Sequence, residues 1–154
     1  MITINKTPNA DSRSANEEMT VESLRESTFQ HIDHVRQALL YFHNKLLEAA
    51  EKHDETKPLT IEDFYEALTS GNVKNSTWYQ YHITEERHHL LSKAPDDVNL
   101  IDVIEYLCDC VMAGLARSGD IYDIELPDEL LQKAFKNTVD LLKSQVEVVD
   151  AEVE

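Results

Sequence analysis

Histidine and aspartate side chains are the groups of this sequence that could do chemistry. All seven histidines lie between positions 31 and 89 of the 154 residues. The first two, His31 and His34, are three residues apart, so they would project from neighbouring points of a helix. Imidazole and carboxylate ligands together suit Mn, Fe, Co, Ni or Zn and make Mg a poorer choice. The sequence therefore predicts a site for a divalent transition metal, with His31 as a ligand beside the apolar stripe of its helix.

The pair His53-Asp54, followed by Lys57, is the centre of the predicted site. A two-residue motif is common by chance, so the residues that accompany it decide its value. Those that follow it in the sequence are His82, the pair His88-His89, and Asp102. We therefore expect two stretches of chain to fold together around metal.

Each candidate also has a structural explanation. Asp102 stands three residues after Asn99, which is a helix-capping pattern. His88 and His89 would serve equally well as polar residues in a surface turn, and Lys57 as a solvated lysine of a loop. The order of the candidates favours metal binding by the group, while both interpretations of the histidine pair stay open.

The hydrophobic pattern predicts the helices that would position these residues. Apolar side chains recur every three or four residues from Thr20 or Ser23 to about Lys52, as in a helix packed on one side. Further helices are expected over residues 61–68, from about 76 to the histidine pair, over 100–116 and over 126–146. Only three glycines occur and no long stretch alternates with period two. The predicted fold class is all-α, a single bundle of about five helices.

The two ends of the chain lack this pattern. Residues 1–19 are polar and have too little apolar surface to offset the entropy of ordering, so we expect a flexible, disordered arm. Residues 147–154 are expected to form an acidic tail, which leaves residues 20–146 as the helical domain.

Composition excludes several classes of function. A formal net charge of -16 opposes direct binding to nucleic-acid polymers, because phosphate contacts need clustered lysine and arginine. No apolar run approaches the roughly 20 residues that cross a bilayer. The first residues contain no apolar segment of the kind that a secretory signal needs. Cys108 and Cys110, two apart in a predicted helix, are expected to be reduced thiols. We therefore expect a cytoplasmic protein without a membrane partner.

The order of these residues resembles the HD-domain superfamily of metal-dependent phosphohydrolases. The resemblance covers about residues 25–117. It consists of His31 on a first helix, then His53-Asp54 with Lys57, and then Asp102 on a later helix. His82 and the pair His88-His89 match the additional histidines of superfamily members that hold two metals. More closely, the chain is similar to a small bacterial and phage family in which an HD pair precedes an HH pair and an NLID-type helix.

The resemblance implies an HD-like helical fold and a set of roles. One or two divalent ions would be held by His31, His53, Asp54, His82, His88, His89 and Asp102. Asp54 would bridge two ions, and Lys57 together with Arg87 would neutralise a phosphate. His34 or Glu86 would orient a ligand or donate a proton. Asp54, Lys57 and His34 are thus the expected catalytic residues.

Two functions follow as hypotheses. The first is a metal-dependent phosphohydrolase that acts on a nucleotide or another small phosphoester in the cytoplasm of a bacterium or a phage-infected cell. The second is a non-catalytic HD-like module that keeps a structural metal and binds a nucleotide or a host protein, for example as a phage inhibitor. A homodimer is compatible with a helical domain of this size.

Overall fold

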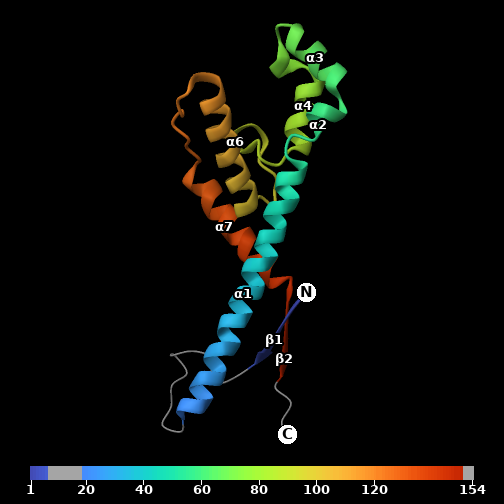
Figure 1. Ribbon diagram of the computed structural model, residues 1–154. Coiled ribbons are helices and arrows are strands. Elements are labelled where there is room, and N and C mark those ends of the chain that lie inside the picture. Colours follow the sequence, from blue (N-terminus) through green and yellow to red (C-terminus); the bar gives the residue numbers. More distant parts are fainter. Residues whose placement is uncertain (7–18, 151–154) are drawn as a thin grey trace. The chain divides into compact units, whose positions relative to one another are not determined.

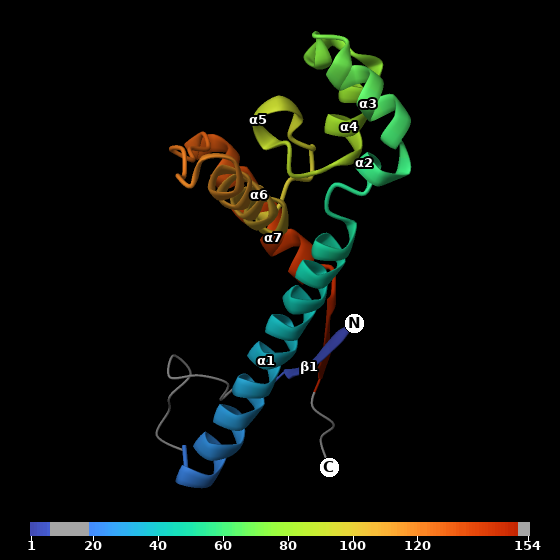
Figure 2. The same ribbon diagram turned by 45° about the horizontal axis from the view of Figure 1, so that its top comes forward.

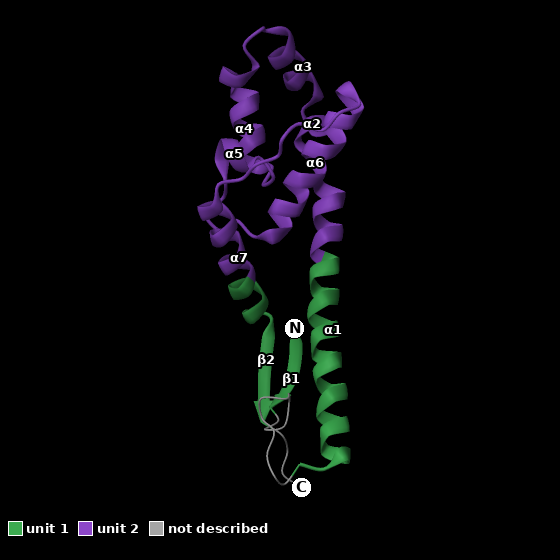
Figure 3. Ribbon diagram, turned by 90° about the vertical axis from the view of Figure 1, so that its left-hand side faces the viewer, with its two compact units in different colours: residues 1–44, 139–154 green, residues 45–138 purple. Residues whose placement is uncertain are grey.

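The computed structural model describes residues 1–6 and 19–150, and the other residues lie outside this description. The described chain is mostly helical and contains one small two-stranded parallel sheet (Figure 1). It divides into two compact units (Figure 3). Unit 1 comprises residues 1–44 and 139–154, and unit 2 comprises residues 45–138. No described helix is both long enough and apolar enough to cross a membrane.

The sheet in unit 1 corrects the all-α prediction. Strand β1 (Ile2–Lys6) pairs in parallel with strand β2 (Val146–Asp150), and Ile2 lies opposite Val146. Residues 2–6 were predicted to belong to a disordered arm, and residues 147–150 to an acidic tail. The prediction of disorder was wrong for residues 2–6, and the last helix was predicted to reach Val146, which instead begins β2. Alternation over five residues is too short to stand out from a polar background. The rest of the predicted arm and tail, residues 7–18 and 151–154, lies outside the described residues.

Helix α1 (Val21–Lys52) confirms the longest predicted helix. At its start Thr20 and Ser23 cap each other: the amide of each residue donates to the hydroxyl of the other, at 3.1 Å. Beyond its end, Asp54 has a φ of 57°. This left-handed conformation breaks the helical path immediately after His53, and the chain then turns into the short helices of unit 2.

Short helices make up the middle of unit 2, and Figure 2 shows them from a second side. Their bounds are α2 (Thr56–Leu59), α3 (Ile61–Thr69), the 3₁₀ turn η2 (Val73–Asn75), α4 (Thr77–Glu85) and α5 (Leu90–Lys93). Ser76 caps α4 by accepting a hydrogen bond from the amide of Tyr79. Between α4 and α5 the chain is irregular, as predicted, and His88 and His89 lie in this segment.

Helices α6 (Leu100–Ser118) and α7 (Asp128–Lys143) complete the helical part. Figures 1 and 2 both show them side by side. The core beneath them contains Leu90, Val98 and Ala134, all buried, with partly buried apolar residues of both helices against it. The amide of Leu100 also donates to the hydroxyl of Thr138, which fixes the start of α6 against α7. The core therefore anchors α6, the helix that brings acidic side chains to the histidines.

Candidate metal centre

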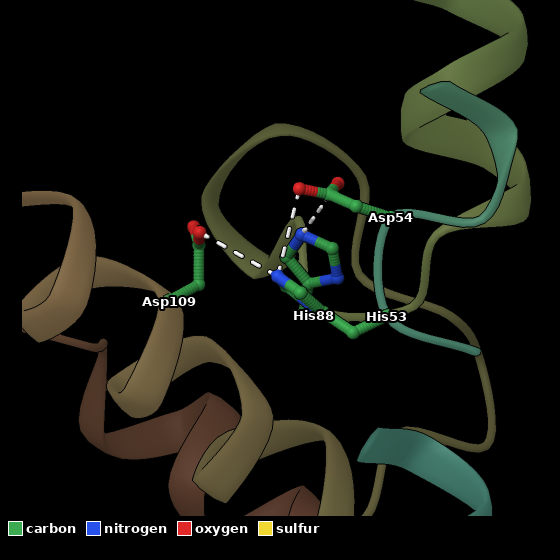
Figure 4. A group of neighbouring side chains, drawn as sticks. All are labelled: His53, Asp54, His88 and Asp109. Atoms are coloured by element: carbon green, nitrogen blue, oxygen red, sulfur yellow. Dashed lines mark ion pairs between the residues drawn. The ribbon is translucent and has the colours of Figure 1, made fainter. Parts of the chain in front are cut away.

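Two groups of metal-ligating side chains share one aspartate in unit 2. In each group, one ligand atom per residue lies within 4.8 Å of every other. The first group is His53, Asp54, His88 and Asp109, and the second is Asp54, His82 and His89. Figure 4 shows the first group: the two imidazoles point toward Asp54, and Asp109 faces them from α6. The turn after α1, helix α4, the segment after it and helix α6 thus converge on Asp54.

Asp54 directs its two carboxylate oxygens to different histidines. Oδ2 lies 3.5 Å from Nε2 of His53, while Oδ1 lies 3.6 Å from Nε2 of His82 and 3.7 Å from Nε2 of His88. The left-handed backbone of Asp54 makes this placement possible, at a cost of about 1 kcal/mol for a residue with a side chain. Strain of this kind is concentrated at functional sites.

The separations between the donors of the first group fit a metal ion better than they fit hydrogen bonds. Two donors bound to one ion at about 2.1 Å in tetrahedral geometry lie about 3.4 Å apart. The imidazole and carboxylate atoms of the first group are 3.5–3.8 Å apart, beyond hydrogen-bond length. Oδ1 of Asp54 and both ring nitrogens of His88 are buried without a hydrogen-bond partner among the described residues. A cation would satisfy Oδ1 of Asp54 and Nε2 of His88.

Glu105 orients two of the histidines. Its Oε1 lies 3.0 Å from Nδ1 of His53 and 3.0 Å from Nδ1 of His88. A carboxylate can only accept, so Nδ1 of His53, which hydrogen-bonds to it, carries the hydrogen and the neutral ring keeps a lone pair on Nε2. Nδ1 of His88 faces the same oxygen as an ion pair. Metal-binding histidines commonly have this arrangement, in which a carboxylate fixes the tautomer and the ring orientation.

A second relay of hydrogen bonds orients His82. The hydroxyl of Thr56 donates to Oε1 of Glu86 at 2.6 Å, and the amide of Thr56 donates to the same oxygen at 2.8 Å. The hydroxyl has no further hydrogen to give, so it accepts from Nδ1 of His82, 2.7 Å away. Nε2 of His82 therefore keeps its lone pair on the side of Asp54. Trp78 stacks on the His82 ring, with centroids 4.8 Å apart, and so restricts the rotation of that ring.

His89 completes the second group as a neutral imidazole. Its Nε2 lies 2.7 Å from Nε2 of His82, a hydrogen bond in which His89 donates because the hydrogen of His82 is on Nδ1. Burial, reinforced by the neighbouring His88 and His82, lowers the pKa of His89 to about 4. Burial is also the main reason that the pKa of His82 is lowered. Neutral imidazoles are the form that binds metal, so the surroundings of both rings favour coordination at neutral pH.

Asp54 and Glu105 have lowered pKa values and His88 has a raised one, each against the effect of burial. Burial alone would raise the pKa of Asp54, but Lys57 and the nearby His53 and His88 outweigh it, so the pKa is lowered. Burial opposes charge on Glu105 in the same way, and its contacts with His88 and His53 lower its pKa nevertheless. Burial would lower the pKa of His88, yet Glu105, Asp54 and Asp109 raise it. The centre is thus rich in anionic carboxylates that a divalent cation would neutralise.

Asp102, predicted as a ligand, has a different position. Its Oδ1 accepts from Nε of Arg87 at 2.7 Å, and its Oδ2 accepts from a terminal nitrogen of Arg87 at 2.8 Å and from the Asn99 amide at 2.9 Å. The hydrogen bonds with Asp102 are the main reason that the pKa of Arg87 is raised. The capping interpretation of the Asn99-x-x-Asp102 pattern is therefore the one that the structure shows, and Asp102 is not in either metal-ligating group.

The other predicted residues divide between the two units. His53, Asp54, His82, His88 and His89 are brought together, and the ammonium group of Lys57 contacts Oδ2 of Asp54. His31 and His34 lie on α1 in unit 1, where they line a pocket with residues of β1 and β2. Neither is part of the two metal-ligating groups found among the described residues.

Asp109, Glu105 and Thr56 are the site residues that the ligand prediction missed. Asp102, Glu105 and Asp109 follow one another at spacings of three and four, so they share one face of α6. That spacing was available in the sequence, but it could not tell which of the three carboxylates would reach the histidines. Thr56 gave no signal, since its role depends on Glu86 and His82 in another segment.

Comparison with known proteins identifies no relative of this chain. No protein-family model, curated protein or solved structure matches this chain.

Proposed function

We propose that this protein is an HD-like, metal-dependent phosphohydrolase that acts on a small phosphoester. The observation that carries the proposal is that Asp54 is shared between two groups of buried donors, one with His53, His88 and Asp109 and one with His82 and His89. A carboxylate shared by two clusters of imidazole donors is an arrangement that a two-metal hydrolytic site can use. The order of these residues along the chain supports the same class.

The metal would be held by this chain's own donors. His53, Asp54, His88 and Asp109 would bind the first ion, and His82 and His89, with Asp54, a second one. In this assignment Asp109 has the role that the sequence suggested for Asp102. Asp102 lies two helical turns before Asp109 on α6. Mixed imidazole and carboxylate donors suit Mn, Fe, Co, Ni or Zn. When bound, such an ion lowers the pKa of a coordinated water and supplies a nucleophile at neutral pH.

The protein side chains would do the remaining work by orientation and charge. Glu105 and the Thr56–Glu86 relay orient the rings of His53 and His82 and fix their tautomers before metal and substrate arrive. Lys57 is the cation nearest to Asp54 and would face the phosphate. Arg87 is held by Asp97 and Asp102, so it stabilises the fold around the centre.

The test is turnover by protein of known metal content. The protein, purified without chelators and loaded with Mn, is assayed for release of inorganic phosphate from nucleoside monophosphates and from alkyl and aryl phosphates. The proposal predicts multiple turnover that disappears in Asp54→Ala and persists in Asp63→Ala, a substitution in the exposed first turn of α3. Bound metal without turnover of any phosphoester would instead support the non-catalytic module.

A further inference from the structure

An apolar groove adjoins the first metal-ligating group. It lies within unit 2 between the last turns of α1 and the middle of α6, and its volume is about 340 Å³. Leu46, Ala49, Ile104 and Met112 contribute to its apolar wall, and His53 and Asp109 are at its polar end. His53 and Asp109, two donors of the proposed metal centre, therefore line the same groove as these apolar side chains.

The charge of the groove restricts its ligand. The polar lining residues are His53, Glu105 and Asp109, and no lysine or arginine lines the groove among the described residues. The two basic side chains near the centre are already paired, Lys57 with Asp54 and Arg87 with Asp97 and Asp102. A polyanion such as a nucleoside triphosphate would place further negative charge beside Glu105 and Asp109, which have only histidines as ion-pair partners in the described part of the chain. Like charges that face each other are strongly unfavourable.

From these observations we infer that the groove binds the alkyl or aryl group of a phosphomonoester whose phosphate lies at the His53 and Asp109 end. This rests on the proposed function and narrows its substrate from phosphoesters in general to apolar ones. The volume is adequate, since a cavity of about 150 Å³ holds a benzene molecule. Small-molecule sites are typically apolar walls with a few convergent polar groups, and this groove has that composition.

The exposed apolar side chains of the wall agree with a ligand-binding role. Met112 is 65% exposed and Ile104 is 43% exposed, so both present hydrocarbon to an entering ligand. Burial of this surface by an alkyl chain would add affinity in proportion to the chain's length. Affinity should therefore rise from a methyl to a hexyl ligand, and it should not require a base or a ribose.

The experiment measures binding, so that it does not depend on catalysis. Isothermal titration calorimetry of the Mn-loaded protein compares methylphosphonate, hexylphosphonate and adenosine monophosphate, and the phosphonates cannot be hydrolysed as esters. The expected result is at least tenfold tighter binding of hexylphosphonate than of either other ligand. Ala49→Phe, which fills the groove, should remove the preference and retain the metal. Ala116→Phe, which adds the same bulk to α6 outside the groove, should retain the preference.

Equal affinity for methyl and hexyl ligands, or a preference that survives Ala49→Phe, would overturn the inference. A preference for adenosine monophosphate would overturn it as well. Phosphate release from methyl and hexyl phosphate at equal rates would leave the proposed function intact and remove the apolar specificity. Selective binding of hexylphosphonate without hydrolysis would support the apolar specificity and contradict the proposed function. A dimer that Met112→Glu dissociates, without any ligand preference, would assign the groove to a second copy of the chain.

Discussion

Oε1 of Glu105 lies 3.0 Å from Nδ1 of His88, a histidine whose side chain is only 1% exposed. The same oxygen lies 3.0 Å from Nδ1 of His53. One carboxylate on α6 therefore aims the Nε2 atoms of two histidines at Asp54, one from the turn after α1 and one from the segment after α4.

Loss of Glu105 should weaken metal binding without removing a ligand. In Glu105→Ala both imidazoles lose the carboxylate that faces their Nδ1 atoms, so we expect Mn or Zn affinity to fall about 10–100-fold. Glu51→Ala, an exposed substitution at the end of α1, should leave the affinity unchanged. Competition with a chelating dye measures both. Wild-type affinity in Glu105→Ala would show that the histidines need no orienting carboxylate.

Substitutions of Asp109 and Asp102 should affect different properties: metal binding for Asp109 and stability for Asp102. Asp109→Asn removes a charged donor of the first group, so metal content should fall while the free energy of unfolding of the metal-free protein changes little. Asp102→Asn breaks the pair with Arg87 and should cost about 2–3 kcal/mol of stability while metal content is retained. Elemental analysis and urea unfolding of the two variants provide the comparison. Loss of metal in Asp102→Asn alone would reverse the assignment of the two residues.

The hydroxyl of Thr56 should be needed for the second group. Thr56→Val leaves Oε1 of Glu86 and Nδ1 of His82 without the group that joins them, which should cost about 1–3 kcal/mol of stability and weaken metal binding. Thr56→Ser retains the hydroxyl and should behave much like wild type. Thermal unfolding with and without Zn distinguishes the two variants. Equal behaviour of Val and Ser at this position would mean that the relay has no energetic role.

The metal-free protein should lose stability as the pH falls from 6.5 toward 4.5. The pKa of His89 is about 4 in the folded state and about 6.5 in the unfolded chain, and the pKa of His82 is lowered too. In this window the unfolded state binds more protons, so stability falls with pH, by roughly 2 kcal/mol for His89. His88, with a raised pKa, has the opposite effect only above pH 6.5.

Urea unfolding at pH 6.5, 5.5 and 4.5, with a chelator present, measures this slope. His89→Asn, which cannot titrate there, should reduce the slope. Stability that is constant or rises toward pH 4.5 would contradict the burial of neutral histidines in the centre.

The helical part of the fold was predictable because its signals are local. The first helix ends at Lys52 as predicted, Asn99 caps α6, and Gly119 adopts a φ of 76° at its end. The strands β1 and β2 were missed, since each spans five residues and gains its pairing from the opposite end of the chain. Pairing between distant segments leaves little trace in either segment alone.

The candidate site was predictable in its histidines and less so in its acidic residues. His53-Asp54 and the later histidines stand out by residue type, and the structure brings them together. Three carboxylates share one face of α6, and only the packing of that helix decides that Asp102 meets Arg87, Glu105 meets His88 and Asp109 meets His53. His31 stands 22 positions before His53, on a helix that the sequence itself predicted to be continuous. That continuity argued against a shared site.

Metal content per chain is the most direct test of the proposed metal centre. Elemental analysis is made on wild type, on the double variant His53→Ala with Asp54→Ala, and on a control with His43→Ala and Asp63→Ala, all purified without chelators. Wild type and control should contain one or two transition-metal ions per chain, and the double variant should lose the metal. Wild-type protein without metal, and with a melting temperature that does not respond to added Mn or Zn, would contradict the proposed metal centre.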